Sequence, residues 1–212
     1  VAIYENTYDL SIKVLEEFSE RGLKFFLKDQ NMSDLIKGYQ TGTLDETKEA
    51  AYKAAFKKNL EEYIKYDGFA GIYAADEPKT QQFAGIGKAA EYFHSLEETK
   101  GREWWVNLLG SGYGAHGSDS YIEHVDEAAR TTGAGRLSFD QYPLYNGKIR
   151  DSFFSNLAQM AATGKVHNKV FDTFILTMGH WDYRTTENYD DLAWQIYTSM
   201  AFGTRGIETF TY

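Results

Sequence analysis

Two apolar runs in this chain each lead directly into carboxylates that are followed by a proline. The first is Phe69–Pro78, in which Asp76 and Glu77 stand side by side, and the second is Leu137–Pro143, which contains Asp140. The chain has only two prolines, and a proline ends strand pairing because it has no backbone N–H. Each run therefore predicts a buried strand with acids at its carboxyl end.

Paired carboxylates in such a place suit the hydrolysis of a glycosidic bond. One carboxylic acid must protonate the leaving oxygen, and a second group must attack or stabilise the developing oxocarbenium carbon. We expect Glu77 to be the general acid, because burial beside another carboxylate would raise its pKa and keep it protonated. The plainer interpretation of Glu77 is an ion pair or a helix cap, and that of Asp76 is a turn residue before proline.

The second catalytic carboxylate is open at this point. Asp140, Asp76 and Asp182 are the candidates that the sequence offers, and Asp140 is preferred to Asp76 because strand parity turns it inward. A further possibility is substrate assistance, in which the 2-acetamido group of the sugar attacks and an Asp only orients it. An adjacent Asp-Glu pair suits that possibility.

These acids need elements to hold them, and the chain alternates strand-like with helix-like segments. Strands are predicted at 1–5, 23–29, 69–76, 103–109, 136–142, 171–178 and 206–212. Helices are predicted at 10–21, 44–65, 80–99, 118–131, 149–163 and 188–201. Such alternation indicates right-handed βαβ units and a parallel sheet. Because no glycine-rich dinucleotide turn follows any strand, the pattern favours a parallel (β/α)8 TIM-type barrel over an open doubly wound sheet.

A complete barrel has eight strands and eight helices in roughly 250 residues. The 212 residues are therefore expected to form a single barrel domain, 1–212, that is truncated at both ends. The first strand and helix and the last helix would be missing. On that count the strands are the second to the eighth, and the strand at 69–76 is the fourth.

Strand parity sorts the side chains between two faces. The small apolar residues of the strand at 69–76 suit contact with helices, which leaves Glu77 on the barrel side. The same argument turns Asp140 and Tyr142 inward and Phe174 outward. For the strands at 1–5, 23–29 and 206–212 the parity is ambiguous, so it does not place Glu5, Asp29 or Glu208.

Polar and aromatic residues at the strand ends are the candidates for contacting a sugar. Aromatic residues make up 16% of the chain, and aromatic faces suit the stacking of sugar rings. The predicted substrate-binding residues are Asn107, Tyr142, His180, Trp181 and Asp29. The segment Gly110–Gly117 would be a flexible loop, either a lid or a long turn.

Composition excludes several classes of function. The net charge of −9 and the pI of about 5.1 argue against nucleic acid, which needs a basic footprint. There is no Cys, and His116, His124 and His180 do not share metal-ligand spacing, so neither a metal nor a cofactor is expected. His124 and Asp126 are predicted to lie on an exposed helix. No apolar run approaches the ~20 residues that a membrane span needs.

Four segments together resemble a known group of enzymes. They are Gly71–Pro78, Trp105–Leu109, Leu137–Pro143 and Trp194–Gly206. In order and spacing they look like the (β/α)8 glycoside hydrolases of gut and environmental bacteria. The resemblance implies a Glu acid/base at the end of the fourth strand, which Glu77 matches. It also implies a Glu nucleophile at the end of the seventh strand, but here that strand ends in Thr177–Asp182 without a Glu. The Asp76-Glu77 pair is similar instead to hexosaminidase-type families that use substrate assistance.

The sequence therefore predicts a bacterial glycoside hydrolase that cleaves an oligosaccharide or glycan. We expect a secreted, periplasmic or cell-surface enzyme whose signal lies outside this chain. The alternative is a non-catalytic carbohydrate-binding barrel that has lost its nucleophile. The two differ in whether a second carboxylate lies within reach of Glu77.

Overall fold

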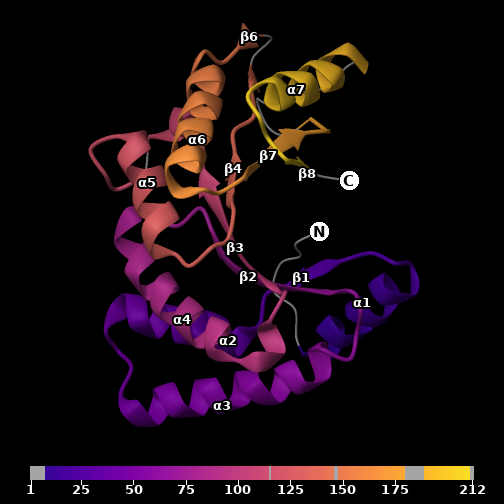
Figure 1. The fold of residues 1–212 in the computed structure, drawn as a ribbon, viewed down its shortest axis with the longest axis vertical. Coiled ribbons are helices and arrows are strands. Elements are labelled where there is room, and N and C mark those ends of the chain that lie inside the picture. The colour runs from indigo at the N-terminus through magenta and orange to yellow at the C-terminus, as the bar shows by residue number, and fades with distance from the viewer. Residues whose placement is uncertain (1–7, 115, 146–147, 180–188, 211–212) are drawn as a thin grey trace. The chain divides into compact units, whose positions relative to one another are not determined.

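The computed structural model describes residues 8–114, 116–145, 148–179 and 189–210 (Figure 1). Within these ranges the α-helices are α1 (Tyr8–Glu20), α2 (Gln30–Thr41), α3 (Glu46–Tyr63), α4 (Phe83–Ser95), α5 (Tyr121–Thr131), α6 (Ser152–His167) and α7 (Tyr189–Ala201). The strands are β1 (Phe25–Leu27), β2 (Phe69–Asp76), β3 (Glu103–Leu109), β4 (Leu137–Asp140), β5 (Leu144–Tyr145), β6 (Lys148–Ile149), β7 (Phe171–Leu176) and β8 (Gly206–Phe210). Short 3-10 helices are η1 (Thr80–Gln82), η2 (Glu97–Thr99) and η3 (Ser111–Tyr113).

Six of these strands form one parallel sheet in the order β1-β2-β3-β4-β7-β8. Each strand lies beside the next strand of the sheet along the chain, with helices in the connections, as in successive βα units of a barrel. The predicted parallel α/β fold is confirmed. Within the described residues β1 and β8 are the edges of the sheet, so the structure has part of a barrel's strands and not a closed barrel. The predicted strand at 1–5 lies outside the described residues.

The helix α2 was missed by the sequence analysis, although its signals are present. Asp29 caps its N-terminus by accepting a hydrogen bond from the Met32 amide at 3.0 Å. Leu35 and Ile36 continue the buried stripe that Met32 begins. Gly42, at φ 65°, ends the helix in the left-handed conformation that glycine adopts without strain. The cap, the stripe and the glycine together predict a helix, but the polar residues between them obscured it.

The antiparallel pair β5-β6 was also not predicted. It follows Pro143 directly and consists of two residues on each side. Such short strands carry no periodic pattern, so the sequence gives no signal for them. The predicted helix at 80–99 is divided into η1, α4 and η2.

The chain divides into two compact units. Unit 1 comprises Val1–Ala75, Gln81–Val106 and Thr131–Gly135, and unit 2 comprises Asp76–Thr80, Asn107–Arg130 and Arg136–Tyr212. The prediction of a single barrel domain stays a prediction.

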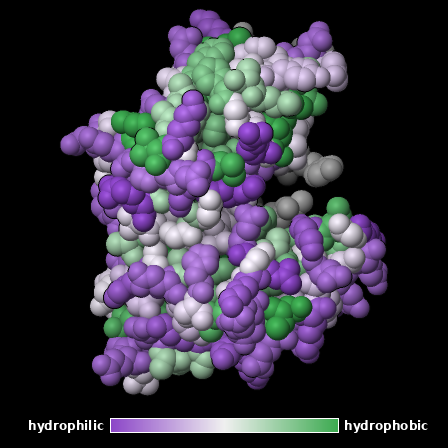
Figure 2. All heavy atoms as spheres, in the orientation of Figure 1, coloured by the Kyte–Doolittle hydropathy of each residue, from purple (hydrophilic) through white to green (hydrophobic). Residues whose placement is uncertain are grey.

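Unit 1 has an aromatic core between its strands and helices. Helix α2 packs against α3 and α4, and α1 packs against α3 and β1 (Figure 1). The side chains of Phe56, Phe69, Phe93 and Trp104 are fully buried, and Phe93 contacts both Phe56 and Trp104 through its ring. The outer side of α3 is hydrophilic (Figure 2). Burial of several large rings on one side of polar helices is what stabilises this unit.

Unit 2 is built on β4, β7 and β8, with α6 and α7 in contact with β7. Helix α7 is fixed to β7 by Gln195, whose fully buried amide exchanges hydrogen bonds of 3.1 Å with both the N–H and the C=O of Leu176. Hydrophobic surface gathers over the region of α6 (Figure 2). Exposed hydrophobic side chains of these two helices are Phe154, Val166, Tyr189, Tyr197 and Met200.

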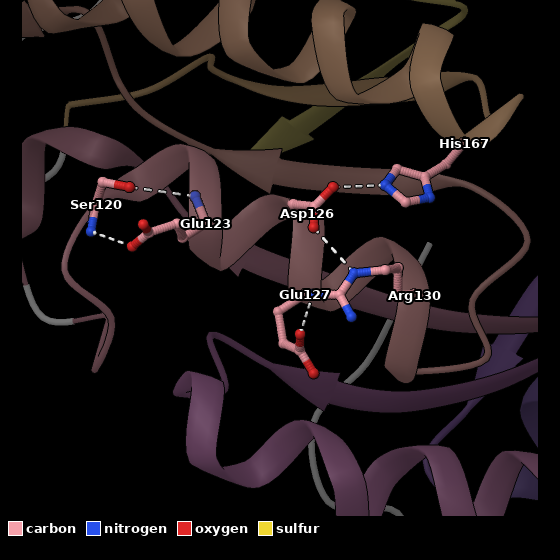
Figure 3. Close-up of polar contacts among 6 residues, drawn as sticks. All are labelled: Ser120, Glu123, Asp126, Glu127, Arg130 and His167. Atoms are coloured by element: carbon pink, nitrogen blue, oxygen red, sulfur yellow. Dashed lines mark hydrogen bonds and ion pairs between the residues drawn. The ribbon is translucent and has the colours of Figure 1, made fainter.

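Helix α5 begins with a capping box and ends in an ion-pair network (Figure 3). The Ser120 amide donates to the Glu123 carboxylate at 3.1 Å, and the Glu123 amide donates to the Ser120 hydroxyl at 3.4 Å. One turn further on, Asp126 accepts from Arg130 Nε at 2.9 Å and contacts His167 Nε2 of α6 at 2.7 Å. Those two partners hold the pKa of Asp126 below its usual value.

Among the described residues, no helix is long and apolar enough to cross a membrane.

Candidate active site

Three carboxylates meet in unit 2 around the amide of Asn107. Asp76 is the last residue of β2, and Glu77 follows it. Asp140 is the last residue of β4, which is separated from β2 in the sheet by β3. Asn107 Nδ2 donates to Asp140 Oδ1 at 2.9 Å and to Asp76 Oδ1 at 3.2 Å. The backbone of Asn107 also accepts from the Glu77 amide at 2.9 Å. Asp76, Glu77 and Asp140 are called the carboxylate cluster below.

Within the cluster, the carboxyl groups of Glu77 and Asp140 interact, and each shifts the pKa of the other. Burial raises the pKa of Asp140 well above its usual range, and the charge of Glu77 raises it further. Burial and the charge of Asp76 also raise the pKa of Glu77, while the hydrogen bond from Asp140 lowers it. The two groups therefore titrate as an interacting pair.

The members of the cluster differ in their access to solvent. The side chain of Asp140 is only 7% exposed, whereas Asp76 and Glu77 are exposed. Glu77 is also one of two non-glycine residues with positive φ in the part of the chain that the structure describes, at φ 46°. Such a backbone conformation costs free energy in a glutamate and is typical of functional sites. At Glu77 the left-handed backbone therefore coincides with a side chain that is open to solvent.

The predicted sugar-binding residues Asn107 and Tyr142 lie at this cluster. Tyr142 follows Asp140 by two residues, is nearly buried, and stacks on Phe210 with ring centroids 5.7 Å apart. Burial raises the pKa of Tyr142, and the charges of Asp140 and of the neighbouring Tyr113 add to the increase. Strand parity had predicted that Asp140 and Tyr142 share a face, and both belong to this site.

Tyr113 is a site residue that the sequence analysis missed. It lies in η3, within the predicted flexible loop, and its ring contacts the Arg150 guanidinium at 4.9 Å from centroid. The same guanidinium lies 4.4 Å from the ring centroid of Tyr145. The start of this loop is fixed, because the Ser111 amide donates to Asn156 Oδ1 at 2.5 Å. The signal for Tyr113 was only its place in a glycine-rich segment after a strand.

A second row of polar residues lies next to the cluster on β4, β7 and β8. The parallel register aligns Ser138 with Asp172, and Asp172 with Gly206. Ser138 contacts Glu208 Oε1 at 3.3 Å. The Arg136 guanidinium is 2.6 Å from Asp172 Oδ2, whose side chain is 1% exposed. The sequence analysis left Glu208 unplaced because the parity of β8 was ambiguous.

The parity predicted for β7 was wrong. Asp140 is paired with Phe174 and Ser138 with Asp172 in a parallel register, and such partners project their side chains from the same face of a sheet. Phe174 therefore shares the face of the cluster, and the buried Ile175 and Thr173 occupy the opposite face. The hydrophobic run misled the analysis because a strand buried on both faces does not alternate.

Unit 2 also buries two histidines beside each other. The rings of His116 and His124 are 4.9 Å apart, and His124 Nδ1 is 2.7 Å from the Thr80 hydroxyl. The prediction that His124 lies on an exposed helix face is wrong, since its side chain is fully buried. Burial lowers the pKa of His124 to about 4, and the charge of His116 contributes. Among the described residues, no group of three or more His, Asp or Glu side chains is arranged to hold a metal ion.

The remaining predicted site residues are not part of this arrangement. His180, Trp181 and Asp182 lie outside the described residues. Asp29 belongs to unit 1 and is 3% exposed. Its Oδ1 caps α2, and its Oδ2 accepts from Tyr63 at 2.7 Å and from Asn59 at 2.9 Å. These contacts give Asp29 a structural role, and its proposed contact with substrate stays a prediction.

We expect Asp29→Ala to destabilise unit 1 by about 2–4 kcal/mol, because it removes a helix cap and leaves the Tyr63 hydroxyl buried without its acceptor. Urea unfolding followed by circular dichroism measures the change. The matched control is Asp45→Ala, which removes the N-cap of α3 at an exposed position and should cost about 1 kcal/mol. Equal losses in the two variants would show that the buried contacts of Asp29 contribute nothing.

Comparison with known proteins gives a likeness in structure alone. No family model matches the chain, and no curated protein matches it in sequence. A crystal structure of a "putative alpha-L-fucosidase" from Bacteroides thetaiotaomicron VPI-5482 superposes with a TM-score of 0.60 at 16% sequence identity. The alignment covers 98% of this chain and 68% of that protein. At 16% identity the likeness shows only that the two chains share a fold.

Proposed function

We propose that this chain is part of a glycoside hydrolase that cleaves an oligosaccharide or glycan, with Glu77 as the general acid. The observation that carries the proposal is the carboxylate cluster at the ends of two parallel strands, in which Asn107 holds Asp76 and Asp140 and the pKa values of Glu77 and Asp140 are raised. Raised pKa values in a coupled carboxyl pair are typical of acid catalysis near neutral pH. The fold shared with a protein described as an alpha-L-fucosidase supports the same class of reaction.

Glu77 is the member of the pair that delivers the proton, because it is exposed and Asp140 is nearly buried. Its proton passes to the glycosidic oxygen as the bond from that oxygen to the anomeric carbon breaks. The bonding electrons stay on the oxygen, which leaves as an alcohol. A water molecule then adds to the anomeric carbon and returns a proton to the carboxylates. One water is consumed and two hydroxyl-bearing products form.

Asp76 is the better candidate for the second carboxylate that faces the substrate. Asp140 is nearly buried, and its carboxyl group interacts with that of Glu77, so it is less accessible to a sugar than Asp76 is. Asp140 is therefore placed to supply and tune the proton of Glu77. Asp76 is exposed beside Glu77, and its carboxylate is oriented by Asn107. An oriented aspartate next to the acid suits substrate assistance by a 2-acetamido group.

The sugar would be held by residues around the cluster. Asn107 and Tyr142 offer an amide and an aromatic ring, and Tyr113 adds a second ring near Tyr142. We propose that His180 and Trp181 contact the sugar as well, as their place after β7 suggests. A secreted, periplasmic or cell-surface location fits a glycan substrate and is part of the proposal.

The test is hydrolysis of a panel of 4-nitrophenyl glycosides by the purified protein, with and without a 2-acetamido group and including the α-L-fucoside. Asp76→Asn is expected to lower kcat by about 10²-fold or more on the preferred substrate. Asp140→Asn should lower kcat less and shift the pH optimum, because Asp140 acts through Glu77. If substrate assistance operates, thiazoline inhibitors should bind tightly, because they mimic the acetamido intermediate.

Two outcomes contradict the proposal. A larger loss in Asp140→Asn than in Asp76→Asn would reverse the roles of the two aspartates. Binding of oligosaccharides without release of product from any substrate would favour the non-catalytic carbohydrate-binding protein instead. Isothermal titration with the same sugars measures that binding.

A further inference from the structure

A chain of hydrogen bonds connects the carboxylate cluster with a fourth carboxyl group, that of Glu208 in the middle of β8. Glu208 Oε1 lies 3.3 Å from Ser138 Oγ. Ser138 Oγ lies 2.9 Å from Asn107 Oδ1. Asn107 Nδ2 in turn donates to Asp140 and Asp76. No step of the mechanism above uses Glu208, although it is connected to the cluster through only two side chains.

The donors and acceptors in this chain fix its direction. The two N–H bonds of the Asn107 amide are both directed at carboxylates, so its oxygen needs a donor from elsewhere. Ser138 is that donor, at 2.9 Å. A serine hydroxyl has a single proton, so Ser138 cannot donate fully to Asn107 and to Glu208 at the same time. The 3.3 Å contact between Ser138 Oγ and Glu208 Oε1 is a full hydrogen bond only if the carboxyl group of Glu208 is protonated and donates to Ser138.

We propose that Glu208 is a positioning residue, which in its protonated form holds Ser138 and Asn107 in the orientation that keeps the carboxylate cluster together. The positioning role of Glu208 is inferred from the hydrogen-bond geometry. Its effect on turnover rests on the proposed function. When Glu208 loses its proton, Ser138 turns its own proton toward the new carboxylate. The Asn107 oxygen then loses its donor, and the amide that orients Asp76 and Asp140 is released.

The surroundings of Glu208 favour the protonated form at neutral pH. Among the residues that the structure describes, the charged groups that face it are Asp172 on β7 and Arg136, which precedes β4 and pairs with Asp172. Burial raises the pKa of Glu208 to about 8, the charge of Asp172 raises it, and Ser138 and Arg136 oppose the increase. Gly206 leaves room for this arrangement, because a Cβ there would lie 2.5 Å from Asp172 Oδ1.

The first test needs no activity. In the wild-type protein with ¹³C-labelled carboxyl groups and ¹⁵N-labelled side-chain amides, NMR should show Glu208 titrating near pH 8. The Asn107 amide signals should shift with the same midpoint. In Glu208→Gln, whose amide donates to Ser138 at every pH, the Asn107 signals should stay constant through that range. Asn107 signals that ignore the titration of Glu208 in the wild type would overturn the inference.

The second test measures stability against pH, and the sign follows from the raised pKa. The unfolded chain loses the Glu208 proton near the ordinary pKa of a glutamate, about 4.3. At pH values between that pKa and the higher pKa of Glu208 in the folded protein, only the folded state holds the proton. The contribution of Glu208 to the free energy of unfolding is therefore fully present at low pH and is lost as pH rises through that window. The urea midpoint of the wild type should fall from pH 5 to pH 9 more than that of Glu208→Gln. Glu91→Gln, at an exposed position on α4, is the control and should follow the wild type.

The third test uses turnover. Glu208→Gln should keep its kcat/KM at higher pH than the wild type, whereas Glu208→Ala should lose about tenfold at pH 7 because Ser138 then lacks the donor that holds its hydroxyl in place. Restoration of the rate by Gln but not by Ala distinguishes positioning from simple loss of volume. If no glycoside is hydrolysed but the Asn107 signals follow Glu208, the proposed function fails and the positioning role stands. Equal activity of the Ala variant and the wild type, in a protein that hydrolyses glycosides, would contradict the role.

Discussion

Glu77→Gln is expected to lower kcat/KM on an unactivated glycoside by about 10²–10⁴-fold, the usual contribution of a general acid. Glutamine keeps the shape of the side chain and its place beside Asp140, but it cannot give a proton to the leaving oxygen. The loss should be much smaller on 4-nitrophenyl glycosides, because a good leaving group needs little protonation. The measurement is a comparison of both substrate types in the wild type and the variant.

The control for this variant is Glu91→Gln, which makes the same chemical change at an exposed position on α4 and should leave both rates unchanged. Circular dichroism checks that the fold is kept. A Glu77→Gln protein that hydrolyses the unactivated glycoside at the wild-type rate would show that Glu77 is not the acid. Equal losses on both substrate types would point to a role in binding.

Gly71→Ala is expected to destabilise the protein by about 3 kcal/mol or more, in the range where overpacking and backbone strain add together. Gly71 lies in β2 at φ 149°, and a Cβ at this position would be 1.9 Å from the backbone oxygen of Glu103 in β3. Both the positive φ and the close contact with Glu103 involve backbone atoms, so the structure cannot relieve either one by moving a side chain. Urea unfolding followed by tryptophan fluorescence measures the loss.

Gly135→Ala is the matched control, because no atom lies within 4 Å of a Cβ built there and its φ is ordinary. It should change stability by less than about 0.5 kcal/mol. If Gly71→Ala unfolds at the same urea concentration as Gly135→Ala, the two strands do not approach as closely as the structure has them.

The strand ends that carry the carboxylate cluster could be predicted from local sequence. An apolar run that ends in acids and a proline marks a strand end, and this pattern gave β2 with Asp76 and Glu77 and β4 with Asp140. The period-two alternation in these strands was enough to place Asp140 and Tyr142 on one face. The parallel α/β class followed in the same way, because strand and helix periods alternate along the chain.

The sequence could not give the states of the groups at the site. The interaction between Glu77 and Asp140, and the approach of Glu208 to Ser138, depend on the register between strands that are far apart in the chain. A shift of one residue in that register would turn these side chains to opposite faces. Burial of His124 likewise depends on what packs over its helix.

By itself, then, the sequence determined which residues could do chemistry and the kind of sheet that carries them, because local periodicity and turn residues act over a few neighbours. Only the tertiary structure decided that Asp140 is nearly buried while Glu77 is exposed, and that Glu208 is joined to Asp140 and Asp76 through Ser138 and Asn107. The physical reason is that the charge state of a carboxyl group depends on desolvation and on neighbours within a few ångströms, and those neighbours come from other strands.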